Sequence, residues 1–307
     1  MDPDRVVPEL RSWVPKYRLP MESSLLRFVA NGILGCLPHR SVPGVRFERR
    51  DGAAHGVRLF IPQERRSRGA LLWIHGGGLI IGHPVMDDRV CAQTALELGI
   101  VVASARYRLA PAHPYPAAID DCHAAWMWLT RNAASLDIDP GGIAIGGQSA
   151  GGGLAAALVQ RIRDGEAPHP AAQWLFCPML DDRTAVQRAL DAERHFVWDN
   201  RLNRYGWGAY LGSDLGGATT PPYAVPARRA DLSGLPAAWV GIGDIDLFFE
   251  EDMTYARRLE GAGVPVTLDV VPGAPHAFEV WGARTTTSTA YMARARHWLA
   301  CAIGSPR

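Results

Sequence analysis

The chain has 307 residues, of which 48% are hydrophobic and 21% charged, as is typical of a soluble globular protein with a large core. Lysine and arginine number 32, aspartate and glutamate 31, so the formal net charge is only +1. A nucleic-acid-binding protein needs a strongly basic surface to neutralise phosphates, and this balance argues against that class. We therefore expect no nucleic-acid partner.

Three further features bear on where the protein works. No stretch approaches the roughly 18 apolar residues of a membrane-spanning helix. The first residues, Met-Asp-Pro-Asp-Arg, lack the basic and then apolar pattern of a secretory signal. The five cysteines show no C-x-x-C spacing, which indicates free thiols and no zinc site or disulfide framework. These features predict a cytoplasmic protein with no membrane span and no metal.

The first part of the chain, residues 1–44, differs from the rest in its sequence pattern. It holds two segments with amphipathic, helical patterning, around residues 12–17 and 23–34, with prolines at positions 15 and 20. We expect this part to pack beside an inserted segment later in the chain, so that the two together form a cap.

Short apolar runs separated by helical patterns fill most of the remaining sequence. Alternating polar and apolar residues predict half-buried strands at 45–49 and 57–61. Fully apolar runs predict strands buried on both faces at 70–74, 100–103, 143–145, 173–177, 238–242 and 266–271. Helical patterns occupy residues 87–98, 117–133, 151–163, 250–261 and 289–302. This alternation predicts an α/β fold with helices on both faces of a mostly parallel sheet.

One long segment interrupts the alternation before residue 238. It carries Trp198, Trp207 and Tyr210 and ends in a stretch rich in proline and glycine. Structureless loops of such length are uncommon in compact domains. We expect a cap insertion at about residues 181–222 within a catalytic domain of residues 45–307, with residues 1–44 as the N-terminal part of the cap.

Residues 147–151 read Gly-Gln-Ser-Ala-Gly and fit the pattern G-x-S-x-G. The pattern alone is weak, because glycine and serine are common and an ordinary glycine-rich turn would match it. A strand-like run precedes it and a helical run follows, which is the context that exposes a serine hydroxyl at the edge of a sheet. Ser149 is therefore the candidate nucleophile, with the N-terminal end of a helix beside it.

Residues 75–78 read His-Gly-Gly-Gly and follow another buried strand. A phosphate-binding loop is disfavoured, because neither G-K-[ST] nor G-x-G-x-x-G with a downstream acid is present. Consecutive glycines let backbone N–H groups converge on a carbonyl oxygen that becomes charged. We expect His75 to anchor this loop without reacting. The expected oxyanion hole consists of Gly76, Gly77, Gly78 and Ala150.

A serine nucleophile needs a base, and the base needs an acid to orient it. Of the ten histidines, His276 follows a strand-like run directly, whereas most others occur in surface or proline-rich contexts. The acid falls between serine and histidine in α/β folds with this motif. Asp244 and Asp246 both follow the strand-like run at 238–242, and spacing alone does not separate them.

Together these motifs resemble the hormone-sensitive-lipase-like family of α/β-hydrolases, in its bacterial carboxylesterase branch. In that family the triad acid is the first residue of a D-x-L/F…D/E-E segment, which lies shortly before the motif Y-A-x-R-L. Here that first residue is Asp246, so the resemblance implies Asp246 as the triad acid. Asp244 would then brace the turn. The resemblance rests on His-Gly-Gly-Gly at 75–78, Tyr-Arg-Leu-Ala-Pro at 107–111, Gly-Gln-Ser-Ala-Gly at 147–151, Asp-Leu-Phe at 246–248, Tyr-Ala-Arg-Arg-Leu-Glu-Gly-Ala-Gly-Val-Pro at 255–265 and Pro-Gly-Ala-Pro-His at 272–276.

The resemblance implies a serine carboxylesterase that hydrolyses short to medium acyl esters through an acyl-enzyme, with no cofactor. An amidase or arylformamidase would use the same residues, and a non-catalytic small-molecule binder is a third, disfavoured alternative because the histidine is present. Related enzymes often pair through the last strand and helix, so a homodimer is a further expectation. The expected acyl pocket is lined by Leu79, Ile80, Trp198, Trp207 and Tyr210.

Four features depart from the family pattern. Gln148 replaces the usual acid before the serine, which removes one negative charge near the site. Ala277 replaces the usual glycine after the histidine. Arg106 and Ala112 replace acids on either side of Tyr-Arg-Leu-Ala-Pro, and Leu79 replaces the usual aromatic residue after the glycines. None of these substitutions removes a catalytic group. We expect them to affect how firmly the neighbouring residues hold the oxyanion loop.

Overall fold

An eight-stranded sheet forms the centre of the computed structural model, which describes residues 2–15, 20–51, 55–165 and 168–304. The strand order is β1-β2-β4-β3-β5-β6-β7-β8. β1 pairs antiparallel with β2, and β2 with β4, whereas the other neighbouring pairs are parallel. The strands are β1 (Val45–Arg50), β2 (Val57–Pro62), β3 (Ala70–Ile74), β4 (Val101–Ala105), β5 (Ile143–Gln148), β6 (Gln173–Phe176), β7 (Ala238–Gly243) and β8 (Val266–Val271).

Burial along the strands follows their place in the sheet. Every residue of β3, β4, β5, β6 and β7 is buried, as strands covered on both faces must be. The edge strands β1 and β8 are partly exposed, which agrees with their polar residues. The fold class expected from the sequence is confirmed.

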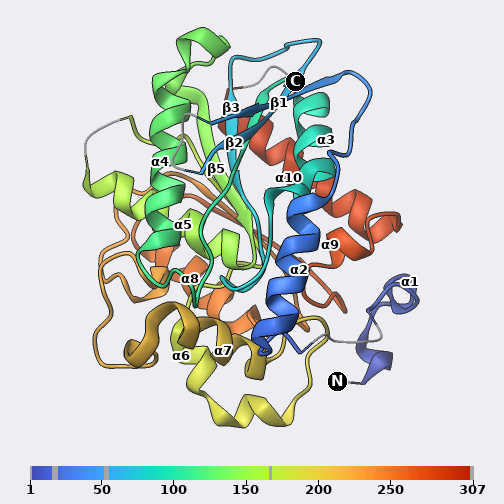
Figure 1. Ribbon diagram of the computed structural model, residues 1–307, viewed down its shortest axis with the longest axis vertical. Helices are drawn as coiled ribbons and strands as arrows, with labels where there is room; N and C mark the ends of the chain where they lie inside the picture. Colours follow the sequence, from blue (N-terminus) through green and yellow to red (C-terminus); the bar gives the residue numbers. More distant parts are fainter. Residues whose placement is uncertain (1, 16–19, 52–54, 166–167, 305–307) are drawn as a thin grey trace.

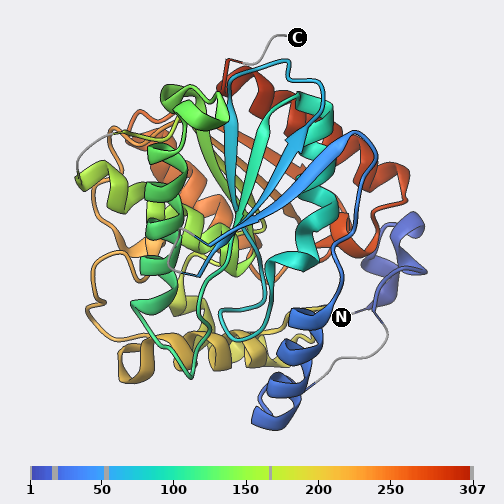
Figure 2. The ribbon, with the colours of Figure 1, turned by 45° about the horizontal axis from the view of Figure 1, so that its top comes forward.

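Helices cover both faces of this sheet, as Figures 1 and 2 show. One face packs against α4 (Ala117–Arg131), α5 (Ala150–Asp164) and α8 (Phe249–Gly261). The other packs against α3 (Asp88–Leu98) and α10 (Thr286–Ala302). Helix α10 begins three residues before the expected start, because the Thr285 hydroxyl accepts a hydrogen bond from the N–H of Ser288 and caps it.

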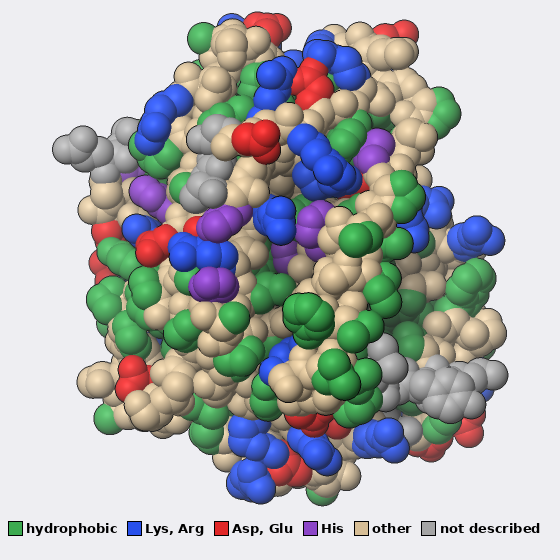
Figure 3. Space-filling view, in the orientation of Figure 1, with side chains coloured by type: hydrophobic (Ala, Val, Ile, Leu, Met, Phe, Trp, Pro, Cys, Tyr) green, Lys and Arg blue, Asp and Glu red, His purple; other side chains and the backbone are tan. Residues whose placement is uncertain are grey.

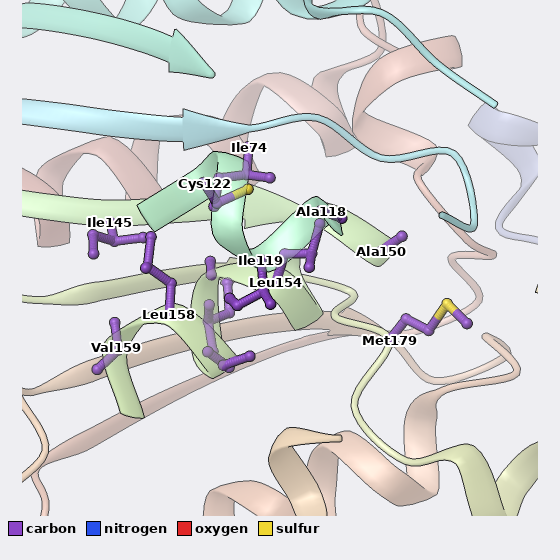
Figure 4. Close-up of a cluster of buried hydrophobic side chains, with 14 of the residues drawn as sticks. Ile74, Ala118, Ile119, Cys122, Ile145, Ala150, Leu154, Leu158, Val159 and Met179 are labelled. Carbon is purple, nitrogen blue, oxygen red and sulfur yellow. The ribbon is translucent and has the colours of Figure 1, made fainter. Parts of the chain in front are cut away.

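Helix α5 is anchored by a large buried cluster. Leu154 and Leu158 of α5 lie in it with Ile119 of α4 and Ile145 of β5 (Figure 4). Twelve of the fifteen residues of α5 are buried. The first turn of α5, which follows Ser149 directly, is therefore held in place by apolar packing.

The segment between β6 and β7 lies at the edge of the sheet where the parallel strands end (Figure 1). It contains the helices α6 (Asp182–Val186) and α7 (Asn200–Leu211) and short 3₁₀ turns at Arg188–Ala192, Gly212–Asp214 and Pro226–Arg228. We call this stretch the β6–β7 segment, and its helices cover the carboxyl ends of the parallel strands.

The N-terminal arm, which we define as residues 2–15, lies against the C-terminal part of the chain. It contains a 3₁₀ turn, Pro3–Arg5, and α1 (Pro8–Arg11), which contacts α10. The Glu9 carboxylate accepts hydrogen bonds from the N–H groups of Thr286 and Thr287, the second at 3.0 Å. The arm thereby caps the N-terminal end of α10. The sequence predicts the first amphipathic segment at residues 12–17. Its described part, residues 12–15, follows the end of α1 and is not helical, and residues 16 and 17 lie outside the described residues.

Helix α2 (Ser24–Cys36) lies next to α7 and exposes much of its apolar surface. Leu25, Phe28 and Ile33 are 69%, 78% and 58% exposed, and Figure 3 shows hydrophobic side chains gathered over this helix. Arg27 points inward, where it donates to the Met21 carbonyl and lies 4.8 Å over the Tyr205 ring of α7. No helix in the described part of the chain has the length and apolar character needed to cross a membrane.

Candidate active site

Ser149 occupies a sharp turn between β5 and α5. Its backbone has φ 54° and ψ −122°, a conformation that side-chain-bearing residues rarely adopt. Its N–H donates a 2.8 Å hydrogen bond to the Phe176 carbonyl, which holds the turn. A Cβ on Gly147 or Gly151 would lie 2.3 or 2.1 Å from backbone oxygens, so only glycine fits on either side. This crowding explains the G-x-S-x-G pattern physically.

The three residues expected to act together are in contact. His276 Nε2 lies 2.9 Å from Ser149 Oγ, and His276 Nδ1 lies 2.7 Å from Asp246 Oδ2. The other oxygen of Asp246 accepts a 3.0 Å hydrogen bond from the N–H of Phe248. All three side chains are buried, at the ends of β5, β7 and β8. This geometry allows the serine proton to move to the imidazole while the carboxylate holds the ring.

The loop that carries His276 is tied down on several sides. The Asp244 carboxylate accepts a 2.6 Å hydrogen bond from the N–H of Gly273, so Asp244 contacts the turn and Asp246 contacts the ring. Val7 of the N-terminal arm donates from its N–H to the Gly273 carbonyl at 2.9 Å. These two contacts hold Gly273, three residues before His276, from both its N–H and its carbonyl.

The glycine loop after β3 adopts a conformation that requires glycine. Gly77 and Gly78 have φ values of +117° and +59°. A Cβ on Gly77 would meet the backbone oxygen of Ile81 at 1.8 Å, and one on Gly78 would meet the indole of Trp198 at 2.0 Å. The loop is therefore packed tightly against Trp198, in the β6–β7 segment.

His75 lies behind this loop and outside the triad. Its Nδ1 is 2.8 Å from the Gly76 carbonyl, and its ring stacks on Tyr107 with centroids 4.2 Å apart. The Tyr107 hydroxyl donates to the His75 carbonyl at 2.9 Å. Burial lowers the pKa of His75 to about 4, so the ring is neutral at neutral pH. The two positions that depart from the family pattern on either side of Tyr-Arg-Leu-Ala-Pro, Arg106 and Ala112, are both exposed.

A cavity of about 730 Å³ opens onto Ser149 and His276. Its walls come from the glycine loop, the N-terminal arm, the β6–β7 segment and the turn after His276, and are mostly apolar. The lining residues from outside the triad and the glycine loop include Val6, Val14, Met21, Trp198, Leu202, Val280 and Trp281.

Four of the five expected pocket residues are elsewhere. Trp198 lines the cavity, whereas Leu79, Ile80, Trp207 and Tyr210 belong to the buried core and are absent from its lining. The reason for Trp207 and Tyr210 is that their rings lie in the core near each other, with centroids 6.2 Å apart. The arm residues Val6 and Val14, which the sequence did not single out, fill part of this wall instead.

Glu279 is a further acid at the site that the sequence analysis missed. It lies in the short helix α9 (Phe278–Trp281), is 5% exposed, and accepts a hydrogen bond from the side-chain amide of Gln148. Burial raises its pKa to about 7, against the opposing effects of its own backbone N–H, Gln148 and His276. A neutral Gln148 at the position of the family's usual acid predicts the loss of a negative charge near Ser149. That substitution was the one sequence signal for Glu279, because the amide of Gln148 needs a hydrogen-bond acceptor as its partner.

One group of side chains close to the triad has the donor types of a metal site. The ligand atoms of Cys177, Asp246 and His276 all lie within 4.8 Å of one another. Asp246 and His276 are already hydrogen-bonded to each other, and burial raises the pKa of the Cys177 thiol well above its usual range. The thiol is therefore protonated at neutral pH, and this group fits the triad better than it fits a metal.

Comparison with known proteins identifies similar sequences and structures. Residues 71–280 match a family model described as "alpha/beta hydrolase fold". Carboxylesterase NlhH of Mycobacterium tuberculosis is 34% identical over 248 residues, 78% of this chain and 78% of that protein. Ethyl acetate hydrolase of Pseudomonas putida is 34% identical over 241 residues, 75% of this chain and 73% of that protein. The structure of a bacterial heroin esterase superposes with a TM-score of 0.86 at 33% identity, covering 98% of both chains.

Proposed function

Because this chain belongs to the α/β-hydrolase family, in its hormone-sensitive-lipase-like branch, we propose that it is a serine carboxylesterase for esters with short to medium acyl chains. The observation that carries this proposal is the continuous contact from Asp246 through His276 to Ser149, beside a glycine-lined cavity.

The proposed reaction runs through an acyl-enzyme. Ser149 Oγ attacks the ester carbonyl carbon while its proton moves to His276 Nε2, and Asp246 stabilises the resulting imidazolium. The carbonyl oxygen becomes negative and accepts hydrogen bonds from the N–H groups of Gly77, Gly78 and Ala150. The carbon–oxygen bond to the alcohol then breaks, and His276 returns the proton to the leaving alcohol.

Hydrolysis of the acyl-enzyme repeats the cycle with water. His276 takes a proton from water as the water oxygen attacks the acyl carbon. The bond to Ser149 Oγ breaks, the imidazolium returns its proton to that oxygen, and the carboxylic acid leaves. The residues as arranged need no metal ligand or cofactor for these steps.

A substitution at the nucleophile tests this proposal. Ser149→Ala removes the attacking oxygen, so hydrolysis of a short aryl ester should fall to background while thermal unfolding stays close to that of the wild type. A phosphonate probe should label the wild-type chain at Ser149 and leave the variant unlabelled. Retained turnover, or labelling at another residue, would reject the proposal.

The mostly apolar cavity supports an ester with an apolar acyl group. A series of aryl esters from two to twelve acyl carbons should give its highest kcat/KM at short to medium length. Matched esters and amides distinguish an esterase from an amidase on the same scaffold, because the same residues serve both reactions. A higher kcat/KM for the amide would move the chain into the alternative class.

We also propose a homodimer that pairs through β8 and α10. In the described part of the chain, β8 ends the sheet and no strand pairs with its outer edge. The apolar residues of α10 support it less, because Tyr291, Met292, Ala295 and Leu299 are buried in the chain's own core. Light scattering on the purified protein measures the mass directly, and a monomer at micromolar concentration would reject this proposal.

A cytoplasmic location is proposed from the state of the cysteines. Cys36, Cys91, Cys122, Cys177 and Cys301 are all free thiols. Fractionation of the producing cells, with an activity assay on each fraction, tests this location.

A further inference from the structure

We propose that Glu279 is a positioning residue for His276: its carboxylate, held by the amide of Gln148, adds a second negative charge that stabilises the imidazolium formed during the reaction. This inference rests on the proposed function, because it assigns a task within the same catalytic cycle.

The first support is the placement of Glu279. It lies three residues after His276 in the one-turn helix α9, and its side chain reaches Gln148. Gln148 is the residue directly before Ser149, is 9% exposed and lines the cavity. The Gln148–Glu279 hydrogen bond therefore joins the strand that carries the nucleophile to the turn that carries the base.

The second support is the position of the Gln148 amide relative to the glycine loop. The Gln148 side-chain oxygen lies 3.7 Å from where a Cβ on Gly76 would be, and its nitrogen donates to Glu279. One amide thus packs against the glycine loop and also holds the acid. Because an amide nitrogen can only donate, it fixes the orientation of the Glu279 carboxyl group whether that group is ionised or neutral.

Among the titratable groups around Glu279, the imidazole of His276 is the one that becomes positively charged. The titratable groups facing it are His276 and Asp246 from the loops after β8 and β7, Cys177 from the end of β6 and Tyr291 from α10. Burial raises the pKa of Cys177 and Tyr291 well above their usual ranges, so both are neutral at neutral pH. The imidazolium is then the cation among these groups, and the buried setting weakens the screening of its attraction to the carboxylate.

The pH at which Glu279 ionises makes the proposal testable. Its raised pKa, about 7, means that the carboxylate is present at pH 8 and largely protonated at pH 5.5. An ionised Glu279 stabilises the imidazolium that forms in the transition state. It therefore raises kcat/KM at high pH, and its own ionisation adds a step near pH 7 to the wild-type profile.

The experiment is a pH profile of kcat/KM from pH 5 to 9 with a short aryl ester, normalised by active-site titration with a phosphonate. Glu279→Gln keeps the shape of the side chain and removes the charge. It should lower kcat/KM about tenfold at pH 8 and leave it within about twofold at pH 5.5, where the wild-type acid is itself neutral. The step near pH 7 that the ionisation of Glu279 adds to the wild-type profile should be missing from the profile of the variant.

A charge-exchange variant separates this task from a merely structural one. In Gln148→Glu/Glu279→Gln the pair is reversed and the negative charge returns to the site from the other side. It should recover most of the activity lost at pH 8. Glu260→Gln, an exposed glutamate in α8, is the matched control and should leave the profile unchanged.

Each outcome has one meaning. An equal loss at every pH in Glu279→Gln, with no recovery in the double variant, overturns the proposal and makes Glu279 a packing residue. An unchanged profile overturns it as well. If Glu279→Gln does not fold, the double variant alone decides, since its profile must resemble that of the wild type. Failure of the esterase proposal itself would appear separately, as turnover that survives Ser149→Ala.

Discussion

The Asp244 carboxylate accepts a 2.6 Å hydrogen bond from the backbone N–H of Gly273, three residues before the histidine of the triad. Asp246, two residues further along, instead contacts the imidazole of His276 at 2.7 Å. Two aspartates on one loop therefore have separate positions: one holds the turn and the other holds the ring. Their substitutions should differ accordingly.

Asp246→Asn should lower kcat by about 10³- to 10⁴-fold, because the asparagine amide offers an N–H to His276 Nδ1 and favours the wrong imidazole tautomer. Asp244→Asn keeps an oxygen acceptor for Gly273 and should cost about tenfold or less. Steady-state kinetics on a short aryl ester, with a thermal unfolding curve for each variant, measures both. Equal losses would contradict the separate positions of the two carboxylates.

Gly78→Ala should lower kcat by about 10²-fold, because the added methyl group displaces the loop whose N–H groups face the reacting carbonyl in the proposed mechanism. The clash is with the side chain of Trp198, 2.0 Å from the new Cβ. The double variant Gly78→Ala/Trp198→Ala should therefore recover part of the loss.

Gly77→Ala is the matched comparison for this prediction. Its Cβ would meet the backbone oxygen of Ile81 at 1.8 Å, and no side-chain truncation removes a backbone atom. Trp198→Ala should therefore leave the Gly77→Ala defect in place. Equal recovery in the two double variants would show that Trp198 is not the obstacle at Gly78.

Ala277→Val should destabilise the fold by about 1–2 kcal/mol, because a β-branched side chain is disfavoured at positive φ. Ala277 has φ 57°, and glycine is the family's usual residue there. The control is Ala262→Val, since Ala262 is also half-buried but has φ −90°, and its change should stay within about 0.5 kcal/mol. Urea unfolding curves measure both, and similar costs would contradict strain at Ala277.

Glu9→Gln should lower the Tm at pH 7, because it weakens the cap that the arm places on α10. Hydrogen bonds from the side chain and N–H of Thr287, and from Thr286, lower the pKa of Glu9 to about 2. A lowered carboxyl pKa stabilises the fold above the unfolded-state value, and this stabilisation disappears as pH falls toward the folded-state value. The difference in Tm between variant and wild type should therefore shrink between pH 4.5 and pH 2.

The control for this prediction is Glu64→Gln, an exposed glutamate after β2, which should shift the Tm little at either pH. A Tm difference for Glu9→Gln that persists unchanged at the lowest pH would show that the carboxylate charge is not what stabilises the cap.

The strands and helices around the site could be predicted because burial on both faces gives an unambiguous apolar run. The strand expected at 143–145 is nevertheless longer, since β5 continues to Gln148. Gly146 and Gly147 have low strand propensity, but the ladder pairs Gly147 with both Ile74 and Leu175 and so overrides it. The end of β5 is therefore set by its pairing with neighbouring strands, which cannot be predicted from the local sequence.

The candidate triad could be found from the motifs, but the pocket could not. Apolar periodicity in α7 shows that Trp207 and Tyr210 are on a buried face, without showing whether that face meets substrate or core. The contribution of Val6 and Val14 depends on the arm's docking onto residues far along the chain. Gln148 and Glu279 are 131 positions apart in the sequence, so no local spacing predicts their hydrogen bond.

The hydrogen bond between Val7 and Gly273 has a consequence for biosynthesis. A ribosome makes the arm well before its partners, Gly273 and the start of α10. Until those partners have been made, the arm has no surface on which to dock, and Leu10, fully buried in the finished protein, stays in water. The nascent chain therefore acquires its base and its pocket wall in one late step, and truncated products released earlier would carry the nucleophile without either.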